Sequence, residues 1–341
     1  MSERIPVSVV TGFLGSGKTT FLNRVLNDGE KSQQTTQIAV IVNEIGAVGL
    51  DHRLVKHISD NVVLLESGCI CCTVRGELID ALRDLFMAAL HKKIPVFSHV
   101  LIETTGLADP APIIYTLRYE RFLSERYRYD GCISVLDAVY GRQHLDRHPE
   151  AMQQLVLADA VVISKTDLVL ADELVGLKGV IAQVNEGASC YDMQSLPPLS
   201  SLLKASSFRN AAVVPRKAAQ AAQGFSAAIA RSVAAHHAQI KVLTLSTEQR
   251  VTRSAFIKSI SRLQEQLGSQ LLRIKGAMYF QGESQASVVQ GVHQQLYPLE
   301  PFDAERAGSD RGKSVLVLIL RGALSAEIEA QLRELLFGVH E

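Results

Sequence analysis

The segment Gly12–Thr19, GFLGSGKT, constrains the fold of this chain more than any other feature of its sequence. It matches the pattern G-x-x-x-x-G-K-S/T, and it lies between an apolar run, PVSVVT, and a helical pattern, KTTFLNRVLND. Its glycines let the backbone wrap around an anion and aim N–H groups at it from the start of a helix. The segment therefore predicts a phosphate-binding loop between the first strand and the first helix of an α/β domain.

The spacing also gives roles to single side chains of this loop. Lys18 is expected to reach the β- and γ-phosphates of a nucleoside triphosphate, and the hydroxyl of Thr19 is expected to bind Mg²⁺. The residues expected to hold the nucleotide here are Gly12, Gly15, Ser16, Gly17, Lys18, Thr19 and Thr20. A glycine-rich turn without a ligand is the alternative, and the strand-loop-helix context disfavours it.

The first two-thirds of the chain alternate apolar runs with helical patterns. The runs QIAVIVNE, VVLLE, HVLIETTG, GCISVLD and AVVISKTD are rich in β-branched residues and nearly continuous in apolar residues, which is typical of parallel strands buried on both faces. This alternation predicts an α/β fold of the P-loop NTPase type, with a doubly wound and mostly parallel sheet. The ligand is expected at the carboxyl ends of the strands.

A change of composition divides the chain into parts. Residues 1–204 carry the predicted nucleotide domain, residues 205–238 are rich in Ala and Gln and are expected to be a linker, and residues 239–341 form a second unit. In that unit, strands are expected at 240–246, 271–280, 287–296 and 313–322, and helices at 256–267 and 325–336. This order predicts a smaller α+β sandwich domain.

Composition narrows the classes of function. The 35 basic and 35 acidic residues of the 341-residue chain cancel, so the overall charge gives no reason to expect nucleic acid or an anionic membrane as a partner. The chain has no apolar run of membrane-spanning length, and its start does not resemble a signal peptide. We therefore expect a cytoplasmic protein with reduced cysteines, of which Cys132 and Cys190 are expected to be small buried side chains.

The segment HVLIETTG supplies a second part of the expected nucleotide site. Glu103 ends an apolar strand and can hold Mg²⁺ through water, while the N–H group of Gly106 can contact the γ-phosphate. A carboxylate at the end of a strand is common. We therefore assign this segment to the nucleotide site because a predicted phosphate loop precedes it in the chain.

The segment SKTD, Ser164–Asp167, resembles the N-K-x-D element by which GTPases select guanine. The carboxylate of Asp167 can accept two hydrogen bonds from guanine that adenine cannot offer, and the stem of Lys165 can cover the base. Ser164 stands in place of Asn, and an amide that would tie this loop to the phosphate loop is expected to be lost. We therefore expect the nucleotide to be GTP rather than ATP. The alternative interpretation of KTD is a helix N-cap that binds no ligand.

Three cysteines, Cys69, Cys71 and Cys72, fall within four residues, just after the predicted strand VVLLE. Thiolates are suited to Zn²⁺, and a cluster of reduced thiols favours metal binding over a disulfide. Three thiolates leave a tetrahedral zinc ion short of ligands, so Glu44, water or a residue of a target protein would complete the site. A redox switch and plain core packing are the alternatives.

Taken in order, the segments TGFLGSGKTT, NEIG, GCICC, ETTGLADP and SKTD resemble the CobW-type family of P-loop GTPases, a group of zinc-binding GTPases and metallochaperones. RIKGAMYFQGE and VVQGVHQQLY are similar to the C-terminal domain of that family, so the resemblance covers nearly the whole chain. It implies GTP hydrolysis, binding of Zn²⁺ or other transition metals at Cys69, Cys71 and Cys72 with Glu44 as a helper, and delivery of metal to a client. Ala47 departs from the family pattern, which often has an acidic residue there.

We therefore expect a GTP-hydrolysing zinc metallochaperone whose partners are GTP or GDP, a transition metal and a client metalloprotein. A C-terminal sheet with an open face would also suit a homo-oligomer. Catalysis is expected from Lys18, Thr19, Glu103 and Gly106, with slow intrinsic turnover because no side chain stands out as the one that positions water. Two other functions share these motifs: a GTP-gated metal sensor, and a nucleotide-dependent metal-insertion factor for cofactor synthesis.

Overall fold

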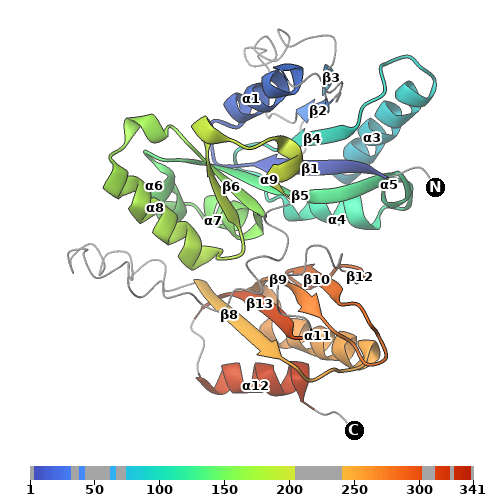
Figure 1. Cartoon of the computed structure of the whole chain (residues 1–341), viewed down its shortest axis with the longest axis vertical. Helices are drawn as coiled ribbons and strands as arrows, with labels where there is room; N and C mark the ends of the chain where they lie inside the picture. The colour runs from blue at the N-terminus through green and yellow to red at the C-terminus, as the bar shows by residue number, and fades with distance from the viewer. Residues whose placement is uncertain are drawn as a thin grey trace. The chain divides into compact units, whose positions relative to one another are not determined.

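The computed structural model describes residues 4–31, 38–42, 62–66, 74–203, 240–301, 312–322 and 326–338. The chain divides into two compact units, residues 1–178 with 189–204 and residues 179–188 with 205–341. Figure 1 labels the helices and strands of both units. Within the described ranges, no helix is both long enough and apolar enough to cross a membrane.

The first unit is built around a seven-stranded sheet in the order β3-β2-β4-β1-β5-β6-β7. Every strand pairing in it that the structure describes is parallel, which confirms the predicted doubly wound sheet. Two details were not predicted, namely the early start of β5 and the whole of β7. The strands are β1 Ile5–Thr11, β2 Ile38–Val42, β3 Val62–Glu66, β4 His99–Glu103, β5 Tyr127–Asp137, β6 Ala160–Ser164 and β7 Ser189–Asp192.

Helices connect these strands and cover both faces of the sheet. Figure 1 shows α1 on one side of the strands and α4 on the other. The helices of residues 4–203 are α1 Lys18–Lys31, α3 Val74–Leu90, α4 Ala111–Tyr119, α5 Arg121–Arg126, α6 Gly141–Arg147, α7 Pro149–Leu157, η1 Thr166–Leu168, α8 Ala171–Val184, η2 Met193–Ser195 and α9 Leu199–Leu202.

Helix α1 packs on the sheet because its apolar residues recur at helical spacing. Phe21, Leu22, Val25 and Leu26 are buried, and they form one core cluster with strand residues such as Val40. Each such side chain stabilises the fold by ~1.5–3 kcal/mol relative to exposure. Because helices cover both faces of the sheet, the inner strands are almost completely buried, which explains why their sequences are almost continuously apolar.

An aromatic cluster joins α3, α5 and β5. The rings of Phe86 and Phe122 meet edge to face with centroids 5.9 Å apart, and the guanidinium of Arg126 lies over Phe122 at 4.2 Å. The hydroxyl of Tyr127 donates a 2.9 Å hydrogen bond to the carbonyl of Leu82. Burial raises the pKa of Tyr127, so its hydroxyl remains a donor.

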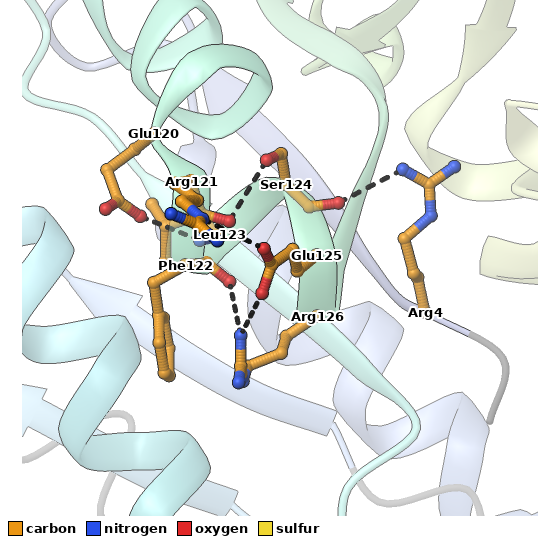
Figure 2. A network of polar contacts seen from close by, with 8 residues as sticks. All are labelled: Arg4, Glu120, Arg121, Phe122, Leu123, Ser124, Glu125 and Arg126. Atoms are coloured by element: carbon orange, nitrogen blue, oxygen red, sulfur yellow. Dashed lines mark hydrogen bonds and ion pairs between the residues drawn. The ribbon is translucent and has the colours of Figure 1, made fainter. Parts of the chain in front are cut away.

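Figure 2 shows the polar contacts within α5 and the one that joins it to Arg4, next to the start of β1. The carboxylate of Glu120 accepts a 2.7 Å hydrogen bond from the N–H group of Leu123 and so caps the helix. Arg126 donates to Glu125 at 3.0 Å, and Arg4 donates to the carbonyl of Ser124 at 3.2 Å. Because β1 and β5 are parallel, these contacts lie at the end of the sheet opposite to the phosphate loop.

The second unit contains a six-stranded sheet whose main path is β11-β10-β9-β13-β8, with β12 paired to β10. Its strand pairings are antiparallel, and α11 and α12 bury apolar side chains such as Phe256, Ile260 and Leu332 against it. The elements are β8 Ile240–Thr247, α11 Arg253–Leu267, η4 Gly268–Gln270, β9 Leu271–Met278, β10 Ser287–Val292, β11 Gln295–Leu296, β12 Glu300–Pro301, β13 Ser314–Arg321 and α12 Ala326–Phe337.

The prediction of an α+β unit is confirmed, but one of its strands was predicted wrongly. Residues 287–296 form two strands of a hairpin rather than one strand, with Val292 paired to Gln295. His293 takes a left-handed backbone conformation, with φ of 51°, and so reverses the chain within two residues. Histidine is less typical of such a turn than Asn or Gly, so the turn was not predicted from the sequence.

Candidate functional site

The phosphate loop lies at the carboxyl end of β1, where the order of the strands reverses. β1 pairs with β4 on one side and with β5 on the other, so that Val10 lies next to Glu103 in one neighbour and Ile133 in the other. The strands β2, β3 and β4 lie on one side of β1, and β5, β6 and β7 lie on the other. Open parallel sheets hold their ligands at such a switch point.

Three glycines give the phosphate loop its shape. Gly12, Gly15 and Gly17 have φ angles of 147°, 69° and 94°, a region that residues with side chains rarely adopt. A Cβ atom on Gly12 would lie 2.3 Å from the carbonyl oxygen of Val135. The loop therefore approaches β5 more closely than a larger residue would allow.

Lys18 begins α1 and folds back over the loop. Its ammonium group donates hydrogen bonds to the carbonyls of Gly12 and Phe13, at 3.0 and 3.3 Å. These carbonyls lie on the chain that surrounds the expected phosphates. The side chain is thus already directed into the loop.

The first turn of α1 supplies further polar groups. The hydroxyl of Ser16 is buried and has no hydrogen-bond partner among the residues that the structure describes. Thr19 is half-buried, whereas Thr20 is exposed. The first N–H groups of a helix lack intrahelical partners and favour an anion. A buried, unpaired hydroxyl at the same place suits a ligand that accepts hydrogen bonds.

The loop after β4 rests on the phosphate loop. The N–H group of Thr104 donates to the carbonyl of Val10 at 2.9 Å, and Glu103, which is 2% exposed, ends β4 beside it. A Cβ atom on Gly106 would lie 2.6–2.9 Å from backbone and side-chain atoms of Leu14. The structure thus brings Glu103 and Gly106 to the phosphate loop, and only a glycine fits where the two loops touch.

The loop after β6 is bonded to the phosphate loop as well. The ammonium group of Lys165 donates to the carbonyl of Gly15 at 3.0 Å and to the carboxylate of Asp137 at 2.5 Å. The hydroxyl of Ser164 donates to the carbonyl of Ser16 at 2.6 Å. We expected Ser164 to leave this loop without a hydrogen bond to the phosphate loop. That expectation is wrong, because a serine side chain is long enough to make the bond.

Asp167 is exposed and lies in the short helical turn η1. The turn begins at Lys165, whose φ of 55° bends the chain away from β6. The hydroxyl of Thr166 donates to the carboxylate of Asp192 at 3.0 Å, and the same oxygen accepts from the N–H group of Gln194 at 2.8 Å. These contacts fix the turn and present the carboxylate of Asp167 at the surface.

Asp137 is a site residue that the sequence did not single out. Its carboxylate is buried and accepts hydrogen bonds from the N–H groups of Val139 and Tyr140, at 2.7 and 3.3 Å, besides the one from Lys165. It therefore holds Lys165 toward the phosphate loop. The signal that could have found it is its position at the end of a buried strand.

A pair of histidines near the phosphate loop was also missed. The ring of Phe13 stacks on His148 at 4.4 Å and lies 4.7 Å from the ring of His144. Burial lowers the pKa of His144, with His148 and Lys165 adding to the shift and Asp137 opposing it, so His144 is neutral near pH 7. The spacing of four residues between the histidines was the available signal.

The expected zinc ligands, Cys69, Cys71, Cys72 and Glu44, lie outside the described residues, as does the linker predicted at 205–238. Elsewhere, in the ranges that the structure describes, no group of three or more His, Cys, Asp or Glu side chains is arranged to hold a metal ion. The metal segment therefore remains a prediction from the sequence.

The two other cysteines differ in exposure. Cys132 is buried in β5, as expected, whereas Cys190 is exposed in β7, so the expectation of burial is wrong for it. The reason is that β7 lies at the edge of the sheet, where fewer elements cover a strand than at its centre.

Comparison with known proteins identifies both parts of the chain. Residues 6–192 match the family model described as CobW/HypB/UreG, nucleotide-binding domain. Residues 240–336 match the model described as cobalamin synthesis protein cobW C-terminal domain.

Several relatives are similar over much of the chain. The zinc chaperone YjiA of Escherichia coli (strain K12) is 32% identical over 317 residues, which make up 92% of this chain and 93% of YjiA. A crystal structure of Zn(II)-bound YjiA GTPase superposes with a TM-score of 0.69 at 27% identity, covering 99% of this chain and 100% of the other. The zinc chaperone CobW of Sinorhizobium sp is 32% identical over 54% of this chain and 57% of its own.

Proposed function

The chain belongs to the CobW/HypB/UreG family of P-loop GTPases, and from that premise we propose that it hydrolyses GTP to control a zinc ion, which it binds at Cys69, Cys71 and Cys72 and passes to client proteins. The observation that carries the nucleotide part is the convergence of three loops, after β1, β4 and β6, at one switch point of the sheet. The zinc part is supported by relatives named zinc chaperones.

The phosphate loop and the start of α1 bind the phosphates in this proposal. On binding GTP, Lys18 exchanges the carbonyls of Gly12 and Phe13 for the β- and γ-phosphates. The buried hydroxyl of Ser16 donates to a phosphate oxygen. In phosphoryl transfer, donors fixed where charge develops account for most of the rate enhancement. This arrangement supplies charge and positioning, and among the described residues no side chain stands out as the one that positions water, so we expect slow intrinsic turnover.

The residues around the loop fit a magnesium ion. Thr19 offers a hydroxyl and Glu103 a buried carboxylate, and oxygen ligands of this kind suit Mg²⁺. When bound, the ion neutralises charge on the β- and γ-phosphates. The N–H group of Gly106 contacts the γ-phosphate and so registers whether it is present.

Asp167 and Lys165 select guanine in this proposal. Asp167 is exposed on a turn that Thr166 and Asp192 hold in place, so its carboxylate is available to the N1–H and N2–H₂ groups of guanine. Lys165 is bonded to both Gly15 and Asp137 beside the phosphate loop, which supports a role for its stem in covering the base.

The zinc segment is joined to strands that end beside the nucleotide site. Val42, at the end of β2, pairs with Glu66, at the end of β3, and also with Glu103. Cys69 follows Glu66 by three residues, a stretch that spans ~10 Å at most. In this proposal, the loss of the γ-phosphate alters the ligands of a metal bound in this segment.

Zinc is the cargo in this proposal, so its binding must depend on the nucleotide. A Zn(II)-bound crystal structure exists of a YjiA variant in which a glutamate and two adjacent cysteines are replaced by alanine. That variant therefore binds zinc without those three side chains. For the present chain, the mere presence of bound zinc is a weaker test than a change in zinc affinity between nucleotide states.

Transfer of zinc to an acceptor tests the proposal directly. The zinc-loaded protein is mixed with an apo zinc enzyme in the presence of Mg²⁺-GDP or of a Mg²⁺-bound, non-hydrolysable GTP analogue, and the recovery of the enzyme's activity is followed. We expect the two nucleotide states to transfer at clearly different rates. A metal sensor would instead retain its zinc in both states, and that outcome would reject the chaperone function while leaving the GTPase intact.

A further inference from the structure

Gln154, on α7, is buried and binds the loop that carries Gly106. The side chain is 1% exposed, and its amide nitrogen donates to the carbonyl of Gly106 and to that of Ala108, both at 3.1 Å. Both hydrogens of the amide are thus used on one short loop. Gln154 lies 48 residues from Gly106 in the sequence, so the fold rather than the local sequence brings the two together.

The orientation of this amide follows from its acceptors. Two carbonyl oxygens can accept only from the nitrogen end, so the side-chain oxygen must point away from them. That oxygen is buried and has no hydrogen-bond partner among the described residues. A side chain that leaves its oxygen unpaired in order to bond two carbonyls is specialised for holding those carbonyls.

The same helix also reaches the phosphate loop. His148 immediately precedes the first residue of α7, and its ring stacks on Phe13 at 4.4 Å. The carbonyl of Phe13 accepts from Lys18 at 3.3 Å. A nine-residue helix therefore contacts the phosphate loop at one end and the Gly106 loop six residues further on.

We propose that Gln154 is a positioning residue for the γ-phosphate, acting through the backbone of Gly106. Gly106 has no side chain of its own to restrain it, and glycine has the widest conformational freedom of any residue. The two hydrogen bonds from Gln154 restrain this loop at the carbonyls of Gly106 and Ala108, so that the turn carrying the Gly106 N–H group keeps its position against Leu14 of the phosphate loop. The inference rests on the GTPase activity and on the role of Gly106, and it does not depend on zinc.

A substitution that keeps the shape of the side chain and removes its donors tests this. Gln154→Met is compared with the wild type in single-turnover GTP hydrolysis and in affinity for Mg²⁺-GDP and for a Mg²⁺-bound, non-hydrolysable GTP analogue. We expect hydrolysis to slow by about ten- to a hundredfold, because small misplacements of a reacting group are costly. The preference for the triphosphate is expected to shrink, while GDP affinity stays within about twofold. Gln143→Met, the same change at an exposed position of α6, is the matched control and should leave all three values unchanged.

A second variant supplies a signature that a packing role would not produce. The carboxyl of Gln154→Glu can donate one hydrogen bond when protonated and none when ionised, and burial raises the pKa of such a group. Its hydrolysis rate relative to the wild type should therefore rise as the pH falls from 8 to 6. This variant also keeps the test open if Gln154→Met does not fold.

The proposal is overturned if Gln154→Met matches the wild type in hydrolysis and in triphosphate preference. It is also overturned if GDP affinity and thermal stability fall in proportion to the rate, since Gln154 would then serve packing alone. A wild-type protein that shows no hydrolysis would contradict the proposed function instead. The affinities for the two nucleotides would still decide the role of Gln154.

Discussion

The hydroxyl of Ser164 donates a 2.6 Å hydrogen bond to the main-chain carbonyl of Ser16, and so joins the end of β6 to the phosphate loop. Both residues are buried, and Gly17 lies against the same serine, with a virtual Cβ 3.4 Å from it. This bond holds the loop expected to recognise the base in a fixed position relative to the loop expected to bind the phosphates.

Removing this bond is expected to weaken nucleotide binding. In Ser164→Ala the buried carbonyl of Ser16 loses its side-chain donor, a change that costs about 1–3 kcal/mol when the acceptor remains buried. If half of that cost, about 0.5–1.5 kcal/mol, is lost from the free energy of nucleotide binding, GDP affinity drops by about two- to twelvefold. Titration with a fluorescent GDP derivative measures it, and Ser246→Ala, at an exposed position of β8, is the control. An unchanged affinity in Ser164→Ala would show that the bond does not organise the site.

Exchanging the carboxylate of Asp167 for an amide is expected to change base selection. Asp167→Asn can no longer accept both guanine hydrogen bonds, and its NH₂ group can donate to a carbonyl at the same place on xanthine. We expect GDP affinity to fall by about a hundredfold and the affinity for xanthosine diphosphate to rise. Competition between the two nucleotides measures the change. Equal guanine affinity in the variant and the wild type would assign base recognition to other residues.

Adding one methyl group at Gly106 is expected to separate diphosphate from triphosphate binding. A Cβ there would lie 2.7 Å from the backbone nitrogen of Leu14, which cannot move without distorting the phosphate loop. Gly106→Ala should therefore weaken binding of the GTP analogue by about tenfold or more, with a smaller effect on GDP. Gly176→Ala, where a Cβ meets nothing within 4 Å, serves as control and should bind both normally. Equal losses for the two nucleotides would contradict a γ-phosphate role.

The buried His99 is expected to make folding stability depend on pH. Its Nε2 lies 2.9 Å from the hydroxyl of Ser8, and burial lowers its pKa from 6.5 to about 4, with Asp130 opposing the shift and Arg128 adding to it. Between these values the unfolded chain binds a proton that the folded chain does not. Stability conferred by neutral His99 is therefore present above pH 6.5 and is lost as the pH falls toward 4.

At 1.36 kcal/mol for each pH unit, the loss at His99 amounts to about 3 kcal/mol. Urea unfolding at pH 7.5 and pH 4.5 measures it in the wild type and in His99→Gln, whose stability should vary less between the two pH values. His91→Gln, at an exposed position, should behave like the wild type. If His99→Gln loses as much stability on acidification as the wild type does, the pH dependence belongs to other groups.

The sheet and the phosphate loop were predictable because their signals are local. Glycines at fixed spacing, an apolar run before them and a helical pattern after them all lie within Ile5–Lys31. The same holds for Glu103 and Gly106, which belong to one strand and the turn that follows it.

Residues brought to the site by other elements were not predictable in this way. Asp137 gains its role because β5 lies between β1 and β6, and Gln154 because α7 packs beside the loop after β4. Asp137 ends a predicted strand, but its bond to Lys165 depends on a neighbouring strand, and Gln154 belongs to no motif in the sequence. The hairpin at His293 was missed for a related reason, since its turn uses a residue that seldom adopts a left-handed conformation.

The central claim is that zinc binding depends on the presence of the γ-phosphate, and zinc affinity in the two nucleotide states tests it most directly. Zinc affinity would be measured by competition with a chromogenic chelator, once for the Mg²⁺-GDP form and once for the form with a non-hydrolysable GTP analogue. Both measurements would be made on the wild type and on a variant that carries Cys69→Ala, Cys71→Ala and Cys72→Ala. We predict that the affinities differ by about 5–150-fold in the wild type and become equal in the variant. Equal zinc affinities in the two states of the wild type would contradict the account.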